Sequence, residues 1–146
     1  MKTIVVPVDL SVAAAQVSKA ACDLARKIGA ELLLLHIVEP PLILSDPYGL
    51  DGGYMEEAVA AATQAGALRL KAMARICAKR GLRVRTLQTF GSPAPEILGQ
   101  ARRAAFIVIG SHGHGAMFDL LVGSTTQGVL KRARCPVMVV PISARR

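Results

Sequence analysis

Residues 106–113 read FIVIGSHG, four apolar residues followed by a glycine, a serine, a histidine and a second glycine. A short, unbroken apolar run is typical of a strand in a parallel sheet that is covered by helices on both faces. A glycine at its end lets the backbone turn sharply and approach a ligand closely. The stretch therefore predicts a buried parallel strand that leads into a polar, glycine-rich loop.

Similar apolar runs recur along the chain and alternate with longer segments of helical periodicity. The predicted strands are Thr3–Val8, Glu31–Val38, Arg83–Thr89, Phe106–Gly110 and Pro136–Pro141, and the predicted helices are Val12–Ile28, Tyr54–Lys79, Ala94–Ala104 and Ser124–Arg134. Ser11 is the predicted N-cap of the first helix, and Gly29 is predicted to end it. Such alternation is typical of α/β proteins with a parallel sheet. We therefore expect one α/β domain over residues 1–146, with Ser143–Arg146 as a frayed basic tail.

The composition is that of a folded, soluble protein. Of the 146 residues, 52% are hydrophobic and 19% are charged, which excludes extensive disorder. No apolar run is long enough for a membrane-spanning helix. The N-terminus lacks the long apolar segment of a secretory signal. We therefore expect a cytoplasmic protein without a membrane span.

The chain is basic, with 18 Lys and Arg against 10 Asp and Glu and a formal net charge of +8. Such a charge attracts anions in general. The basic residues are spread along the chain, aromatic residues make up only 3% of it, and no known nucleic-acid-binding motif is present. Specific nucleic-acid binding is therefore not expected.

Three cysteines and one histidine fall within the predicted helices, strands and turns. Cys22, Cys77 and Cys135 show no C-x-x-C spacing, and we interpret all three as reduced packing residues. His36 lies inside an apolar strand and is interpreted as a core histidine or one on a dimer face. The segment Glu39–Gly53 is rich in proline and glycine, and its length suggests a lid or a partner-binding loop.

Candidate binding residues follow two of the predicted strands. In open parallel sheets, ligands bind beyond the carboxyl ends of the strands, where the strand order reverses. Asp9 follows the first strand and offers a carboxylate to ribose hydroxyls, although an acid before a helix is also a common N-cap. His112 in the loop after the fourth strand is interpreted as a phosphate contact or as a solvated loop residue.

The glycines after the fourth strand form the pattern G-x2-G-x9-G-S at Gly110, Gly113 and Gly123-Ser124, followed by Thr125. Backbone N–H groups in a glycine loop and at a helix N-terminus are suited to phosphate. Glycines also serve simply as turns after strands, so each one alone is ambiguous. Neither the Walker A motif nor the Rossmann glycine motif is present at the required place.

Taken together, these motifs resemble the universal stress protein family. The resemblance is carried by Ile4–Asp9 with Ser11, Leu33–Val38, Gly91-Ser92-Pro93, Ile107–Gly113, Gly123-Ser124 and Cys135-Pro136-Val137. The spacing of the glycines resembles the nucleotide-binding signature of the family's ATP-binding subgroup. The resemblance implies an open five-stranded parallel sheet of order 3-2-1-4-5 with helices on both faces.

The resemblance also implies the roles of individual residues. Pro7, Val8 and Val38 would line the adenine site, with the backbone of Val38 reading the base, and Asp9 would bind the ribose. Ile109 and Gly110 would continue the wall of the site. The phosphates of ATP, ADP or AMP would be held by Gly113, Gly123, Ser124 and Thr125, with Mg²⁺ or Mn²⁺ bound mainly by the phosphates and by no protein side chain.

At the level of the whole protein, the resemblance implies a homodimer through Val137–Val140 of the last strand. We expect an adenine-nucleotide-binding regulator of the stress response, with an unidentified protein partner and without dedicated catalysis, because no lysine lies in the loop. Two alternatives stay open. One is a protein-interaction module in which the glycine loop is only structural, and the other is a slow ATP hydrolase.

Overall fold

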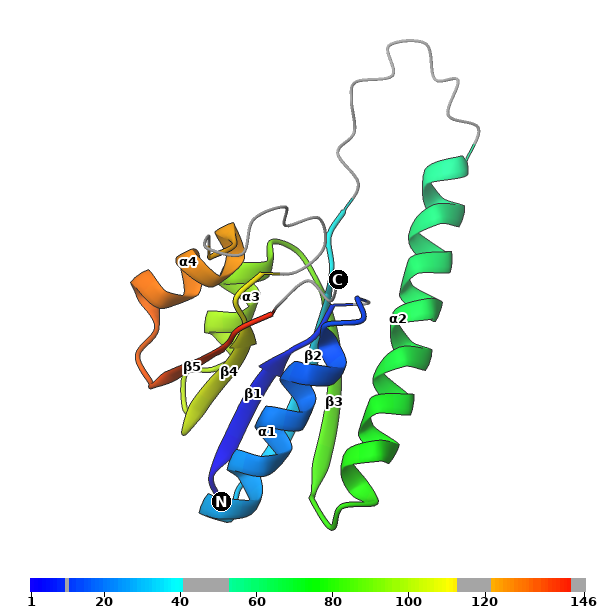
Figure 1. Cartoon of the computed structure of the whole chain (residues 1–146). Coiled ribbons are helices and arrows are strands. Elements are labelled where there is room, and N and C mark those ends of the chain that lie inside the picture. The colour runs from blue at the N-terminus through cyan, green and yellow to red at the C-terminus, as the bar shows by residue number, and fades with distance from the viewer. Residues whose placement is uncertain (10, 41–52, 113–121, 143–146) are drawn as a thin grey trace.

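The computed structural model describes residues 1–9, 11–40, 53–112 and 122–142 (Figure 1). The elements in chain order are β1 (Thr3–Pro7), α1 (Ala14–Ile28), β2 (Glu31–Val38), α2 (Tyr54–Ala78), β3 (Val84–Phe90), α3 (Pro93–Gln100), β4 (Phe106–Gly110), α4 (Ser124–Arg132) and β5 (Val137–Val140). The strands pair in parallel in the order β3-β2-β1-β4-β5. The α/β fold and the strand order expected from the sequence are confirmed.

Two apolar layers hold helices against the two faces of the sheet (Figure 1). Because side chains alternate along a strand, Ile4 and Val6 of β1 point to one layer and Val5 points to the other. The first layer contains α1 and α2, and the second contains α3 and α4. Burial of the aliphatic strand residues between these layers is the main stabilising contribution to the fold.

The start of α1 differs from the prediction. The helix begins at Ala14 rather than Val12, and Ser11 does not cap it. Instead, the N–H and the hydroxyl of Ser11 both donate to Oδ1 of Asp9, the N–H at 2.9 Å. This Asx-type turn uses the polar groups of Ser11 before the helix starts. Gly29 does end α1, with φ of 66° and its N–H donating to the carbonyl of Ala25.

The other helices and strands begin and end within a few residues of their predicted positions. α3 ends at Gln100, four residues before the predicted end at Ala104, and α4 ends at Arg132 rather than Arg134. The chain turns after α3, with the Ala104 N–H donating to the carbonyl of Ala101. The predicted tail and most of the predicted Glu39–Gly53 loop lie outside the described residues. Among the described helices, none is both long enough and apolar enough to cross a membrane.

Candidate functional site

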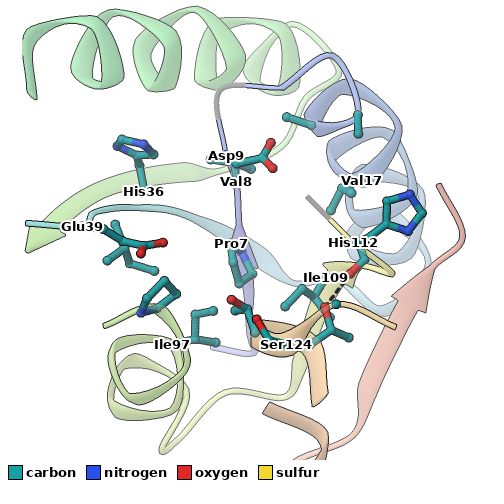
Figure 2. Close-up of a pocket in the computed structure, with 18 residues that line it drawn as sticks. Pro7, Val8, Asp9, Val17, His36, Glu39, Ile97, Ile109, His112 and Ser124 are labelled. Carbon is teal, nitrogen blue, oxygen red and sulfur yellow. Dashed lines mark hydrogen bonds between the residues drawn. The ribbon is translucent and has the colours of Figure 1, made fainter. Parts of the chain in front are cut away.

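A cavity of about 470 Å³ opens beyond the carboxyl ends of β1, β2 and β4 (Figure 2). It lies where the strand order reverses between β1 and β4, the usual ligand position in such sheets. Nine of the predicted site residues line it: Pro7, Val8, Asp9, Ile109, Gly110, His112, Gly123, Ser124 and Thr125. The structure therefore brings together residues that are more than one hundred positions apart in the sequence.

Val38 is the predicted residue that the structure does not bring to the cavity. Its carbonyl accepts the N–H of Gly91 at 3.1 Å, so its backbone faces β3. Backbone polar groups alternate sides along a parallel strand. The neighbouring Ile37 therefore directs its N–H and carbonyl toward the β1 side, where β1 has already ended at Pro7. Ile37 lines the cavity and Val38 does not, so the backbone polar groups of Ile37, rather than those of Val38, are directed toward the site.

Gly113 is the other predicted residue that the cavity lining does not contain, because it lies outside the described residues. The lining also contains residues that the sequence interpretation missed. They are Ala13, Ala14 and Val17 from the start of α1, His36, Ile37 and Glu39 from the end of β2, Pro93 and Ile97 from α3, and Thr126 from α4. Alternation along β2 was the one available signal, since it separates the backbone directions of Ile37 and Val38.

Asp9 has one carboxylate oxygen engaged within the chain. Its Oδ1 accepts both hydrogen bonds from Ser11, whereas no hydrogen bond from the described residues reaches Oδ2. Figure 2 shows the carboxylate of Asp9 beyond the end of β1, well separated from Ser124. Asp9 thus orders the turn before α1 without capping the helix, and it lines the cavity with its carboxylate.

The end of β4 is tied to the start of α4. The hydroxyl of Thr126 donates to the carbonyl of Gly110 at 2.8 Å, and the Gly123 N–H donates to the carbonyl of Ser111 at 2.7 Å. A Cβ on Gly123 would lie 3.3 Å from Cα of His112, so glycine permits this close approach. The end of β4 and the start of α4 are therefore neighbours, although ten residues separate His112 from Gly123 along the chain.

The N-terminus of α4 faces the cavity through Ser124, Thr125 and Thr126. No side chain caps this helix, and its first turn contains no acidic residue. The first N–H groups of a helix have no partner within the helix, and the helix dipole makes this end positive. These properties are suited to an anion such as phosphate.

His36 connects the cavity to α2. The residue is 7% exposed, and its Nδ1 accepts a hydrogen bond from Nε2 of Gln88 at 3.0 Å. The same amide nitrogen donates to the carbonyl of Thr63 on α2 at 3.1 Å. Burial lowers the pKa of His36, and the nearby charge of Asp9 opposes this effect. An accepting Nδ1 and a lowered pKa both indicate a neutral ring, as expected for a core histidine.

The charged residues of the lining are few. Asp9 and Glu39 provide carboxylates, and the described lining contains neither lysine nor arginine. Nowhere in the described part of the chain do three His, Cys, Asp or Glu side chains come together as a metal site.

The model of the universal stress protein family matches residues 1–141. The chain belongs to the universal stress protein family. A universal stress protein of Thermus aquaticus is 36% identical over 143 residues, which cover 95% of this chain and 98% of the relative. The solved structure of a universal stress protein from Lactobacillus plantarum superposes with a TM-score of 0.84 at 25% identity, over 95% of this chain and 97% of the other.

Two further universal stress protein structures were solved with nucleotides. One is described as a complex with cAMP, and it shares 20% identity and a TM-score of 0.65 over 95% of both chains. The other, from Archaeoglobus fulgidus, is described as a complex with dAMP. It shares 22% identity and a TM-score of 0.64, over 95% of this chain and 97% of that one. At these identities the likeness shows a common fold.

Proposed function

We propose that this universal stress protein binds an adenine nucleotide in the cavity at the carboxyl ends of β1, β2 and β4. The observation that carries the proposal is the pairing of two complementary groups in one cavity. The uncapped N-terminus of α4 provides an anion site, and Asp9 provides a hydrogen-bond acceptor away from it. A nucleotide has an anionic end and a hydroxyl-bearing sugar, so it matches both groups.

The proposed pose places each part of the nucleotide against a group of matching chemistry. The phosphates lie on the backbone of Gly123, Ser124 and Thr125. The ribose hydroxyls donate to Oδ2 of Asp9. The base packs on the apolar part of the lining, and its edge meets the backbone of Ile37, whose polar groups point past the end of β1.

Solved relatives support an adenine base in particular. Structures of this fold are described in complex with cAMP and with dAMP, both of which contain adenine. Since neither ligand carries a triphosphate, these two structures do not indicate the number of phosphates that this chain binds. ATP, ADP and AMP are therefore all candidates. Mg²⁺ or Mn²⁺ would bind through the phosphates of ATP, because the phosphate end of the described lining offers the hydroxyls of Ser124 and Thr125 and no carboxylate.

Regulation rather than dedicated hydrolysis is the proposed role. Hydrolysis of ATP needs a group that positions water and cations that stabilise the transition state. The described lining contains no lysine or arginine, and Asp9 is assigned to the ribose.

We expect a cytoplasmic homodimer through β5, whose residues Val137–Val140 pair with β4 alone within the described sheet. An unpaired edge strand of this kind is suited to pairing with a second copy.

Isothermal titration with ATP and with AMP, each with and without Mg²⁺, tests the binding proposal. We expect saturable binding of at least one nucleotide. We also expect phosphate release from ATP at the background rate, both in the wild type and after mutation of Ser124. Absence of binding for both would favour a protein-interaction module. Steady phosphate release that depends on Ser124 would favour a hydrolase.

A separate experiment tests the dimer. Sedimentation measures the molecular mass of the wild type and of Met138→Lys, which places a charge on β5, with Leu68→Lys on α2 as the control.

A further inference from the structure

Two cysteines that are far apart in the sequence meet in the core between α1 and α2. The Sγ atoms of Cys22 and Cys77 are 3.0 Å apart, although 55 positions separate the residues along the chain. Each residue is 1% exposed. The sulfurs therefore face each other directly, with no space for another group between them.

The thiol pair borders a groove between the two helices. This groove has a volume of about 450 Å³, and both cysteines are among the residues that line it. Three basic side chains, Lys19, Arg69 and Arg80, also line the groove. A small oxidant can thus approach the buried sulfurs along the groove without passing through the packed interior of the sheet.

We propose that Cys22 and Cys77 are a redox modification site at which a hydroperoxide forms a reversible disulfide that joins α1 to α2. The sulfurs need to approach by only about 1 Å to reach the S–S bond length of about 2.05 Å. Either a change in side-chain rotamer or a small shift of one helix supplies this movement. The proposal is independent of the nucleotide site.

The reaction balances with hydrogen peroxide as the oxidant. The thiolate of one cysteine attacks a peroxide oxygen, the O–O bond breaks, and the departing hydroxide takes up the thiol proton as water, which leaves a sulfenic acid. The second thiol attacks the sulfenic sulfur, its proton leaves with the hydroxyl group as a second water, and the S–S bond forms. Two thiols are oxidised and one peroxide is reduced. A small dithiol reverses the step by exchange.

The environment of the pair sets its reactivity. Burial and the contact with Cys22 raise the pKa of Cys77 to about 12. The thiolate is the reactive form, so attack by Cys77 at neutral pH is slow and accelerates about tenfold per pH unit while its thiolate is scarce. Oxidation that begins at Cys77 therefore requires sustained exposure to the oxidant.

Cys135 supplies an internal control. It is partly exposed and packs in the other apolar layer, with α3 and α4. The sheet separates that layer from the one containing Cys22 and Cys77, so an intramolecular bond from Cys135 to either is excluded by the fold. A bond within the pair leaves Cys135 as the single free thiol.

The test is to incubate the folded protein with hydrogen peroxide and count thiols after denaturation. The chain has three cysteines, and we expect the count to fall from three to one, with the mass lower by two hydrogens. A proteolytic peptide pair that links Cys22 to Cys77 should appear, and dithiothreitol should restore all three thiols. In the Cys135→Ser variant, the number of free thiols should fall from two to none, and no disulfide should form between chains.

A second readout is the denaturation midpoint, which should be higher in the oxidised than in the reduced protein, because a cross-link restricts the unfolded chain. In Cys77→Ala this difference should disappear. The proposal is overturned if the folded protein keeps three thiols, if peroxide adds oxygen atoms without removing two hydrogens, or if the recovered disulfide contains Cys135.

Discussion

Asp9 combines a structural role with the binding role that we propose for it. Its Oδ1 orders the turn that precedes α1 through Ser11, and this turn places the carboxylate at the end of β1. The second oxygen is then held toward the cavity at little conformational cost. Preorganisation of this kind reduces the entropy lost when a ligand binds.

We predict that Asp9→Asn weakens nucleotide binding by about tenfold or more, because hydrogen bonds to a charged group contribute about 1.5–3 kcal/mol. Asparagine keeps an acceptor for Ser11, so the thermal midpoint should change little. Calorimetry measures the affinity, and circular dichroism measures the midpoint. Asp23→Asn, which removes an exposed acid that pairs with Lys19, is the matched control. Equal affinity in wild type and Asp9→Asn would contradict the ribose assignment.

His36 makes the stability depend on pH. Burial lowers its pKa in the folded state below the value of about 6.5 that it has in the unfolded chain. Between these two values the unfolded chain binds more protons, so stability is lost as the pH falls below about 6.5. Protonated Nδ1 would also lose its role as acceptor for Gln88.

We therefore predict a lower urea midpoint at about pH 5.5 than at about pH 7.5, with a smaller difference in His36→Asn. Asparagine keeps an acceptor near the position of Nδ1 but does not titrate. Only the pH difference within each protein is compared, since the smaller side chain also changes the baseline stability. An identical pH difference in both proteins would show that other groups cause it.

At the scale of elements, α2 rests on β2 and β3 through a close contact at Gly66. A Cβ at this position would lie 2.5 Å from Nε2 of Gln88 and 2.6 Å from the His36 ring. Glycine is the least favourable helix residue apart from proline. Its presence in the middle of α2 is therefore explained by the approach of the helix to the sheet.

We predict that Gly66→Ala destabilises the fold by about 1–3 kcal/mol through overpacking, despite the better helix propensity of alanine. Gly99→Ala on α3 is the control, because a Cβ there meets no atom within 4 Å. The control should be neutral or stabilised by up to about 1 kcal/mol. Urea denaturation measures both variants. A stable Gly66→Ala would mean that α2 is not tightly seated on the sheet.

The N-terminus of α4 gives a prediction in which stability and binding move in opposite directions. An acid at the start of a helix stabilises it by about 0.3–1 kcal/mol, because it complements the dipole. The same charge would repel a phosphate bound there. Ser124→Asp should therefore unfold at an equal or higher temperature and bind ATP at least about tenfold more weakly, with a smaller loss for AMP.

Ser124→Asn is the neutral control for this variant, since it has a similar shape and no charge. Calorimetry provides the affinities and differential scanning provides the midpoints. If Ser124→Asp binds ATP with the affinity of the wild type, the placement of the phosphates at the N-terminus of α4 is wrong, even if the nucleotide binds elsewhere.

For the whole molecule, the pattern of apolar runs was enough to predict the strands, and the family resemblance supplied their order. The cavity residues followed because the ends of parallel strands meet at one edge of the sheet. The contacts of individual residues were harder to predict from the sequence. The sequence predicts Ser11 as a helix cap, whereas its bonds to Asp9 compete with capping. It predicts Val38 at the base, whereas a one-residue shift along β2 reverses the backbone direction and brings Ile37 to the cavity.

The contact between Cys22 and Cys77 illustrates a second limit of sequence interpretation. The two residues lie on different helices, and their proximity depends on how α1 and α2 pack side by side. Neither spacing nor composition encodes that packing. Contacts between helices that share a face of the sheet therefore emerge only from the complete fold.

The most direct test of the central claim is a backbone amide NMR titration of the wild-type protein with ATP. A nucleotide in the proposed pose should shift the amide signals of Ile37, Ser124 and Thr125 most strongly, with saturation at one nucleotide per chain. Ile37 reports the base edge, and the other two report the phosphates at α4. Absence of shifts, or shifts confined to the groove between α1 and α2, would contradict the account.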